Sequence, residues 1–249
     1  MNSFLLALQF LTVIPLRIKD VDERKISRAA GYFPLVGLLL GLILVGINSC
    51  LSILHFPGFA AAIILIVSLA VITGGMHLDG LADTADAFLS GKAKDEMLVI
   101  MRDPHIGVMG VLSIVAALLI KAALLYSISA PLKIIALLLM CVLSRWGAVL
   151  AMSLFPYARK DGKAGVYIRG MNRGILIFAL ITTLFFSFLI WQFKGVFALL
   201  AISGCVYLGA GFSRRKIDGI TGDILGAGIE LAEVVVLFIV CSAGGLING

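Results

Sequence analysis

Residues 58–86 read GFAAAIILIVSLAVITGGMHLDGLADTAD, a long apolar run that ends in three closely spaced aspartates. The run is close to the length of about 20 residues that a helix needs to cross a bilayer. Asp79, Asp83 and Asp86 follow at the spacing i, i+4 and i+7, which places the three carboxylates on one face of a helix. Clustered negative charges at a membrane boundary repel one another unless water or a cation neutralises them. The stretch therefore predicts a membrane helix that leads into a polar site at the bilayer surface.

The composition supports this interpretation. The chain has 249 residues, of which 61% are apolar and only 14% are charged. A soluble domain is about half apolar and about a quarter charged, so we expect an integral membrane protein with one polytopic domain over residues 1–249. The net charge of +6 follows from membrane topology, so no nucleic-acid partner is expected. We expect no cleavable signal peptide, because no basic segment precedes the apolar residues 3–14.

Further apolar runs predict an all-α helical bundle of about seven transmembrane helices. The predicted spans are residues 34–54, 58–76, 107–129, 131–154, 174–193, 195–212 and 229–247. Residues 3–16 are too short to span comfortably, so they predict a short interfacial or re-entrant helix that ends at Pro15. A membrane β-barrel is disfavoured because the runs lack the polar and apolar alternation of barrel strands.

The basic residues set the predicted orientation. Most of the 20 lysines and arginines fall in four segments that seven alternating spans place on one side: residues 17–28, 92–102, 159–173 and 214–216. Cytoplasmic loops carry the excess of Lys and Arg, so these segments are predicted to be cytoplasmic, and an active site would face the cytoplasm. Nearly all acidic residues share that side. This one-sided placement argues against a transporter, which needs access from both sides.

Two acidic groups are candidate metal ligands. The first is Asp79, Asp83 and Asp86; the second joins Asp223 to Glu230, again at the spacing i to i+7. Carboxylates are hard oxygen ligands that suit Mg²⁺ or Mn²⁺ rather than Zn²⁺. Glu230 falls in the first turns of a predicted span, where a buried acid indicates function. Together the two groups could hold Mg²⁺ ions across a diphosphate; the alternative is a solvated acidic helix face.

Basic side chains near these acids are candidates for phosphate binding. Arg102 could clamp a phosphate through two hydrogen bonds, and Asp103 could be a further ligand or a charge at a helix N-terminus. The alternative for this pair is helix capping with ordinary topological charge. Arg159, Lys160 and Lys163 lie in a basic loop that could bind an anionic substrate or anchor to anionic lipid headgroups.

Three more ionisable residues fall in or next to predicted spans. Arg145 lies toward the cytoplasmic half of its span, from which it could reach the acidic cluster or a phosphate. Lys121 lies nearer the far side, so we expect it to snorkel toward water. His77 precedes the acidic cluster and is a candidate for acid–base work or a substrate contact, with a structural role as the alternative.

The segment GMHLDGLADTAD, residues 75–86, closely resembles the signature of the cobalamin synthase family, the adenosylcobinamide-GDP ribazoletransferases. The resemblance extends to residues 8–15, 32–37, 101–103, 106–107, 219–223 and 225–227. Two departures are visible. Ala87 stands where the family pattern has glycine, and Pro104-His105 stands where serine or proline followed by arginine is usual. No phosphate-binding role is therefore carried over to His105.

The resemblance implies a late step in assembling the nucleotide loop of vitamin B12. A ribose hydroxyl of α-ribazole, or of its 5′-phosphate, would attack the phosphorus attached to the corrinoid of adenosylcobinamide-GDP. GMP would leave, and adenosylcobalamin or its 5′-phosphate would form. The resemblance also implies Mg²⁺ dependence and a place in the bacterial cytoplasmic (inner) membrane.

Combined with the resemblance, the residues suggest a division of roles. Asp79, Asp83, Asp86 and Asp223 would hold Mg²⁺ on the diphosphate. Transition-state charge would be stabilised by Arg102 and Arg145, and the hydroxyl proton would pass to Asp103, Glu230 or His77, if any side chain takes it. Phosphoryl transfer depends mostly on positioning and charge neutralisation, so the proton acceptor contributes least.

Two other classes of function stay open. A CDP-alcohol phosphotransferase also has an Asp-Gly pair like Asp79-Gly80, but its Ala-Arg is absent here because Ala82 is followed by Asp83. A membrane carrier would use the intramembrane acids as its coupling site. The 27 glycines permit close helix packing within one protomer or in a homo-oligomer.

Overall fold

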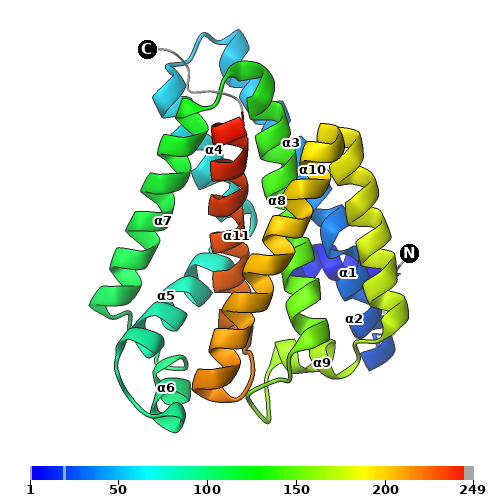
Figure 1. Cartoon of the computed structure of the whole chain (residues 1–249), viewed down its shortest axis with the longest axis vertical. Coiled ribbons are helices and arrows are strands. Elements are labelled where there is room, and N and C mark those ends of the chain that lie inside the picture. The colour runs from blue at the N-terminus through cyan, green and yellow to red at the C-terminus, as the bar shows by residue number, and fades with distance from the viewer. Residues whose placement is uncertain (1, 19–20, 244–249) are drawn as a thin grey trace.

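The computed structural model describes residues 2–18 and 21–243, and the regular elements in these ranges are all helical (Figure 1). In chain order they are α1 (Asn2–Leu11), α2 (Glu23–Ala29), the 3₁₀ turn η1 (Ala30–Tyr32), α3 (Phe33–Ile53), α4 (Gly58–Ile72), α5 (Met76–Leu89), α6 (Lys94–Ile100), α7 (Val108–Ser127), α8 (Ala130–Leu154), α9 (Lys163–Arg169), α10 (Arg173–Ile217) and α11 (Gly222–Ala243).

Length and composition make this a multi-pass membrane bundle. Five helical segments in the described ranges are long and apolar enough to span a membrane: Glu23–Ile53, α7, α8, α10 and α11. The pair α4 and α5 would add a sixth as a broken span. The 45-residue α10 is a hairpin of two legs, because Trp191 and Gln192 leave the helical backbone, and the legs run up and back down in Figure 1. The predicted all-α membrane bundle is confirmed, and each predicted span corresponds to a helix or to one leg of α10; residues 244–247 of the last predicted span lie outside the described residues.

Several predicted boundaries are wrong. The last span does not begin at residue 229, because α11 begins at Gly222. The Thr221 hydroxyl there accepts the backbone N–H of Ile224 and so caps the first turn. The N-terminal helix ends at Leu11, four residues before Pro15, and it buries Leu11 against the bundle.

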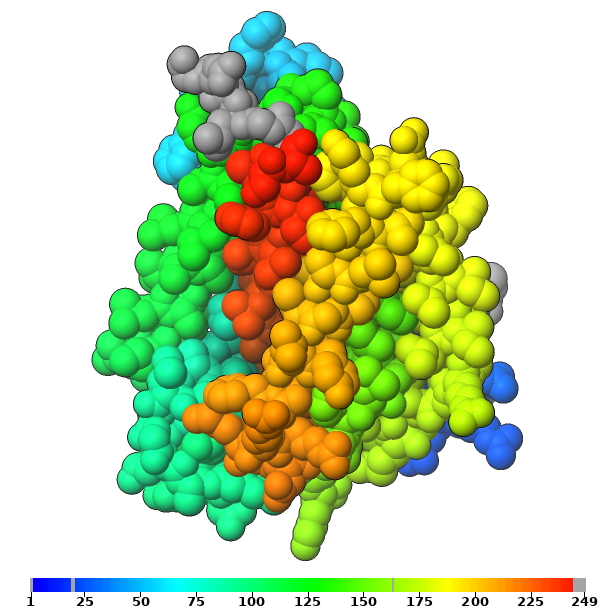
Figure 2. Space-filling model, viewed as in Figure 1, coloured from blue at the N-terminus to red at the C-terminus, as the bar shows by residue number. Residues whose placement is uncertain are grey.

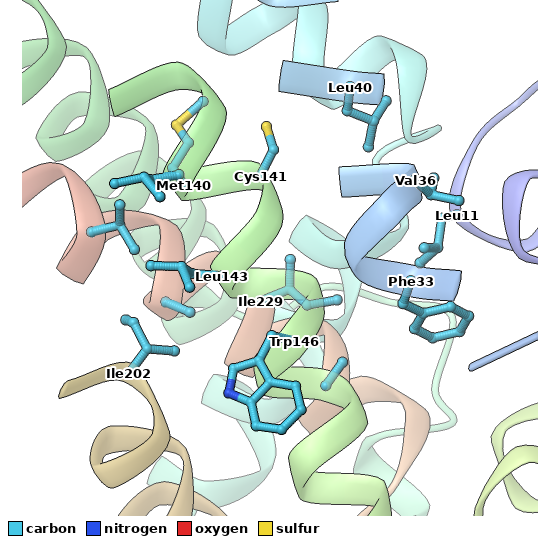
Figure 3. Close-up of a cluster of buried hydrophobic side chains, with 14 of the residues drawn as sticks. Leu11, Phe33, Val36, Leu40, Met140, Cys141, Leu143, Trp146, Ile202 and Ile229 are labelled. Atoms are coloured by element: carbon cyan, nitrogen blue, oxygen red, sulfur yellow. The ribbon is translucent and has the colours of Figure 1, made fainter. Parts of the chain in front are cut away.

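Helix α8 forms the centre of the bundle and packs against α3, α10 and α11. Its side chains Met140, Leu143 and Trp146 lie among residues from the surrounding helices in Figure 3. Gly37 of α3 allows a very close approach, because a Cβ atom there would lie 2.3 Å from the carbonyl oxygen of Cys141. Close packing around small residues is the usual basis of helix association in membranes. On the face shown in Figure 2, the second leg of α10 lies beside α11.

A sharp turn after α4 redirects the chain. Gly74 and Gly75 have φ angles of 65° and 67°, a left-handed conformation that glycine adopts without strain. Across this turn α5 is bent by 90° from α4. It therefore slants away from α11 toward the lower end of α7 in Figure 1, and it packs against both helices. We call the end that carries α2, α5, α6 and α9 the polar end.

Candidate active site at the polar end

The acidic helix α5 crosses α11 at very short range. A Cβ atom on Gly80 would lie 2.7 Å from the carbonyl oxygen of Asp223, and one on Gly226 would lie 3.3 Å from the backbone of His77. Only glycine fits at such a crossing without displacing a backbone. The crossing brings the face of α5 that carries Asp79 and Asp83 beside the start of α11.

The loop after α8 brings a positively charged arginine side chain to this crossing. The backbones of Tyr157 and Ile220 form a parallel β-bridge, in which Ala158 N–H donates to the Ile220 carbonyl at 2.9 Å. The bridge holds the loop beside the N-terminus of α11, and Arg159 Nη2 lies 2.8 Å from Asp223 Oδ2. The structure thus pairs a predicted substrate-binding residue with a predicted metal ligand from a segment more than 60 residues away in the chain.

The negative charge of Asp83 is disfavoured by its surroundings, as its pKa shows. Burial, together with repulsion from Asp79 and Asp223, raises the pKa of the Asp83 carboxyl from 3.8 to about 7, and Arg159 opposes the rise. One arginine therefore does not neutralise the carboxylates around it. A cation bound beside Asp83 would relieve the repulsion.

This repulsion predicts an unusual dependence of stability on pH. Since the pKa of Asp83 in the folded protein, about 7, lies above the ordinary value of 3.8, the charged carboxylate destabilises the fold. The penalty is full above pH 7 and disappears as the pH falls toward 4. With a chelator present, the thermal unfolding midpoint is therefore expected to rise as the pH is lowered from about 8 to about 5. Asp83→Asn should show a flatter pH dependence in detergent solution; identical slopes for both proteins would contradict the assignment.

Asp86, the third residue of the acidic motif, caps the next span. Its two carboxylate oxygens accept backbone N–H bonds from Gly107 at 2.7 Å and Gly110 at 2.8 Å. A negative charge at this position also complements the N-terminal end of α7. The contact uses one lone pair on each oxygen and fixes where α7 begins relative to α5.

A cavity of about 270 Å³ adjoins the cluster, and Asp79, Asp223, Arg159 and His77 line part of it. His77 is only 2% exposed, and its Nε2 has no hydrogen-bond partner within the described residues. A buried polar atom without a partner is costly. The imidazole is therefore available to a molecule that enters the cavity.

Other predicted site residues lie away from the cavity wall. Arg102 and Asp103 are exposed in the loop before α7. Asp103 accepts the backbone N–H of His105 at 2.9 Å, and this hydrogen bond holds the pKa of the Asp103 carboxyl below its usual value. Lys160 is exposed. Lys163 begins α9, but its side chain lies outside the described part of the structure.

The ionisable residues inside the spans form a buried network. Lys121 Nζ on α7 lies 2.6 Å from Glu233 of α11 and also donates to Glu230. Arg145 on α8 donates to the other oxygen of Glu233 and, at 2.9 Å, to the Ser144 hydroxyl. The exposed fractions of the four charged side chains lie between 0% and 7%. Two cations and two anions thus compensate one another inside the bundle.

This network changes the interpretation of three residues. The expectation that Lys121 snorkels toward water is wrong, because two carboxylates of α11 hold its ammonium group inside the bundle. Glu230 is engaged by Lys121 rather than by the cluster around Asp223. Arg145 is fully buried against Glu233 and does not line the cavity.

Comparison with known proteins identifies the family. Residues 3–241 match the family described as cobalamin-5-phosphate synthase. The chain belongs to this family. The match covers nearly all the described helices, including both elements that cross at Gly80 and Gly226.

Several curated proteins that are similar to this chain are described as adenosylcobinamide-GDP ribazoletransferase. The protein of that description from Desulforamulus reducens is 35% identical, and the match covers 96% of both chains. The one from Clostridioides difficile strain 630 is also 35% identical, over 95% of this chain and 96% of its own. The one from Geotalea daltonii is 33% identical over 98% and 99% of the two chains. No solved structure matches the chain.

The donor set at the crossing fits the Mg²⁺ implied for a cobalamin-5-phosphate synthase. Within residues 2–18 and 21–243, no three His, Cys, Asp or Glu side chains already stand in a coordinating arrangement. Mg²⁺, however, is usually held by one or two carboxylates together with water and substrate phosphates. The incompletely neutralised carboxylates of Asp79, Asp83 and Asp223 provide such a partial ligand set.

Sequence reasoning missed contacts between distant segments. Opposite charges within spans are a signal for pairing, and Lys121 with Glu233 follows that rule. Three aromatic residues that also line the cavity, Phe10, Phe33 and Tyr167, lie in separate segments, and no pattern in the sequence links them. Their meeting depends on how α1, α3 and α9 pack.

Proposed function

We propose that this protein transfers the adenosylcobinamide-phosphate group from adenosylcobinamide-GDP to α-ribazole, or to its 5′-phosphate. One observation supports this assignment most directly. In a chain of the cobalamin-5-phosphate synthase family, the acidic signature lies across α11 and borders a cavity with Arg159 on its wall. The curated relatives are named for the same transfer.

The reaction exchanges one phosphorus–oxygen bond for another. The acceptor hydroxyl oxygen forms a bond to the phosphorus attached to the corrinoid, and the bond from that phosphorus to the bridging oxygen breaks. GMP leaves with that oxygen, and the hydroxyl proton is released. Asp79, Asp83 and Asp223 would hold Mg²⁺, which when bound neutralises charge on the diphosphate.

Basic and neutral side chains of the site have separate roles in this proposal. Arg159 can exchange its ion pair with Asp223 for a two-bond contact with a phosphate. Arg102, on an exposed loop, can close on the diphosphate from the solvent side. Of the three candidate proton acceptors, only His77 lines the cavity, whereas Asp103 bonds to His105 and Glu230 to Lys121. We therefore assign the contact with the acceptor hydroxyl to His77.

The proposal includes a location. The excess of Lys and Arg in the segments of the polar end supports a position of that end in the cytoplasm of a bacterial cell, with the bundle in the cytoplasmic membrane. Water-soluble nucleotides and corrinoids reach the site from that side. Basic residues of this end also suit contacts with anionic lipid headgroups.

A direct assay tests this function. Membranes containing the protein, incubated with adenosylcobinamide-GDP, α-ribazole and Mg²⁺, are expected to form adenosylcobalamin and GMP in equal amounts. A parallel reaction with α-ribazole 5′-phosphate identifies the preferred acceptor, and a chelator should stop both reactions. Absence of a cobalamin product with either acceptor would overturn the proposed function, and CDP-alcohol turnover by the same membranes would replace it.

A further inference from the structure

Three aromatic rings from distant parts of the chain form one wall of the cavity. Phe10 of α1, Phe33 of α3 and Tyr167 of α9 all line it. The ring centre of Phe10 lies 4.6 Å from that of Tyr167 and 5.7 Å from that of Phe33, and the centres of Phe33 and Tyr167 are 5.7 Å apart. These separations are typical of direct aromatic contact. The three rings therefore present a continuous aromatic surface to the cavity.

The space beside these rings is large enough for a flat aromatic molecule. An apolar cavity of about 150 Å³ is sufficient to bind benzene. The cavity here measures about 270 Å³, which leaves room for a second fused ring. Leu11 and Ile229 extend the apolar lining, and Figure 3 shows both in the buried cluster that contains Phe33.

The same cavity has a polar part. Asp79, Asp223, Arg159 and His77 line it together with the aromatic rings. A ligand that satisfies both parts combines a flat apolar ring system with hydroxyl groups that reach the carboxylates. Neither a lipid chain, which has no flat ring system, nor a bare phosphate, which has no apolar part, matches both requirements.

We propose that this cavity binds the acceptor nucleoside, with its two-ring aromatic base against Phe10, Phe33 and Tyr167 and its ribose toward His77 and Asp79. The inference rests on the proposed function and adds the place and the chemistry by which the acceptor is recognised. The attacking hydroxyl then lies at the carboxylate cluster, where the diphosphate of the donor must also bind. The three rings are thus specificity-determining residues for the base.

Tyr167 supplies the polar feature of the aromatic wall. Burial raises the pKa of its phenol above the usual value, so the hydroxyl stays protonated in the cell. It has no hydrogen-bond partner in the described part of the chain. A ring nitrogen of a heterocyclic base is a suitable acceptor for this donor.

Steady-state kinetics with each substrate varied separately tests the proposal. Loss of one aromatic contact in Phe10→Leu is expected to raise the KM for α-ribazole about 10-fold and to leave the KM for adenosylcobinamide-GDP unchanged. Phe4→Leu is the matched control, because Phe4 lies on the same helix and contacts Tyr32 instead of the cavity. This control should leave both KM values at those of the wild type.

A second variant fills the cavity instead of opening it. Ala164 lines the cavity, and Ala164→Leu is expected to raise the acceptor KM without changing the donor KM. If wild-type protein is active and both Phe10→Leu and Ala164→Leu keep its acceptor KM, the binding-site inference is overturned and the proposed function stands. If the wild type makes no cobalamin, the proposed function itself fails. In that case the cavity is tested directly by measuring the binding of α-ribazole, without donor, to the wild type and to both variants. Weaker binding by the variants supports the site, and equal binding overturns it.

Discussion

Asp83→Asn is expected to lower the rate of cobalamin formation by at least about 100-fold, the loss usual when a group that stabilises transition-state charge is removed. Asp83 lies between Asp79 and Asp86 on the face of α5 that meets Asp223, and an amide there is a poorer ligand for a hard cation. The same change should stabilise the cation-free fold at pH 8, because it removes a carboxylate whose neighbours disfavour its charge. Loss of activity with a gain of stability distinguishes a functional residue from a structural one.

The measurements compare the purified protein in detergent across a range of Mg²⁺ concentrations. Asp95→Asn is a suitable control, since Asp95 is an exposed carboxylate on α6. We expect that control to keep the wild-type rate, unfolding midpoint and Mg²⁺ dependence. Near-normal transfer by Asp83→Asn with an unchanged Mg²⁺ dependence would defeat the metal-site assignment.

Lys121→Met is expected to cost about 3–5 kcal/mol of stability, as is typical when one partner of a buried ion pair is removed. The substitution leaves Glu230 and Glu233 close together, with only Arg145 to compensate them. Unfolding in a mixed detergent system, followed by tryptophan fluorescence, measures the loss. Lys133→Met, at a lysine with no carboxylate partner in the described ranges, should change stability by no more than about 1 kcal/mol.

A double variant separates charge compensation from simple packing. Lys121→Met combined with Glu230→Met leaves Glu233 and Arg145 as a neutral pair, and apolar side chains of similar volume replace the other two. Most of the lost stability should return, because a well-packed apolar replacement of a buried pair is often neutral or stabilising. A double variant as unstable as Lys121→Met alone would show that the ammonium group matters for another reason.

The sequence was informative where one segment contains the whole signal. Apolar runs of spanning length located the helices, and two runs separated near residue 194 correctly indicated the hairpin within α10. The spacing of Asp79, Asp83 and Asp86 correctly predicted a helix with an acidic face. Boundaries were less predictable. The capping of α11 by Thr221 moves its start seven residues upstream of the predicted span, into a stretch that hydropathy treats as loop.

Contacts between helices were not predictable from one sequence. Helical periodicity says which residues share a face, but it does not say which neighbour that face meets. Lys121 was therefore assigned to water, although Glu233, more than 110 residues later, lies 2.6 Å away. The same limit applies to the pair of Arg159 with Asp223.

The turn at Gly74 and Gly75 also fixes the length of α4, which has 15 residues, whereas α7, which packs against it, has 20. At a rise of 1.5 Å per residue α4 is about 22 Å long, shorter than the hydrocarbon core of about 30 Å. Lipids beside α4 must thin to match it, since a bilayer adapts to a short apolar stretch. We therefore expect the membrane surface to dip beside α5, so that the acidic helix meets water at a depth that acyl chains occupy elsewhere.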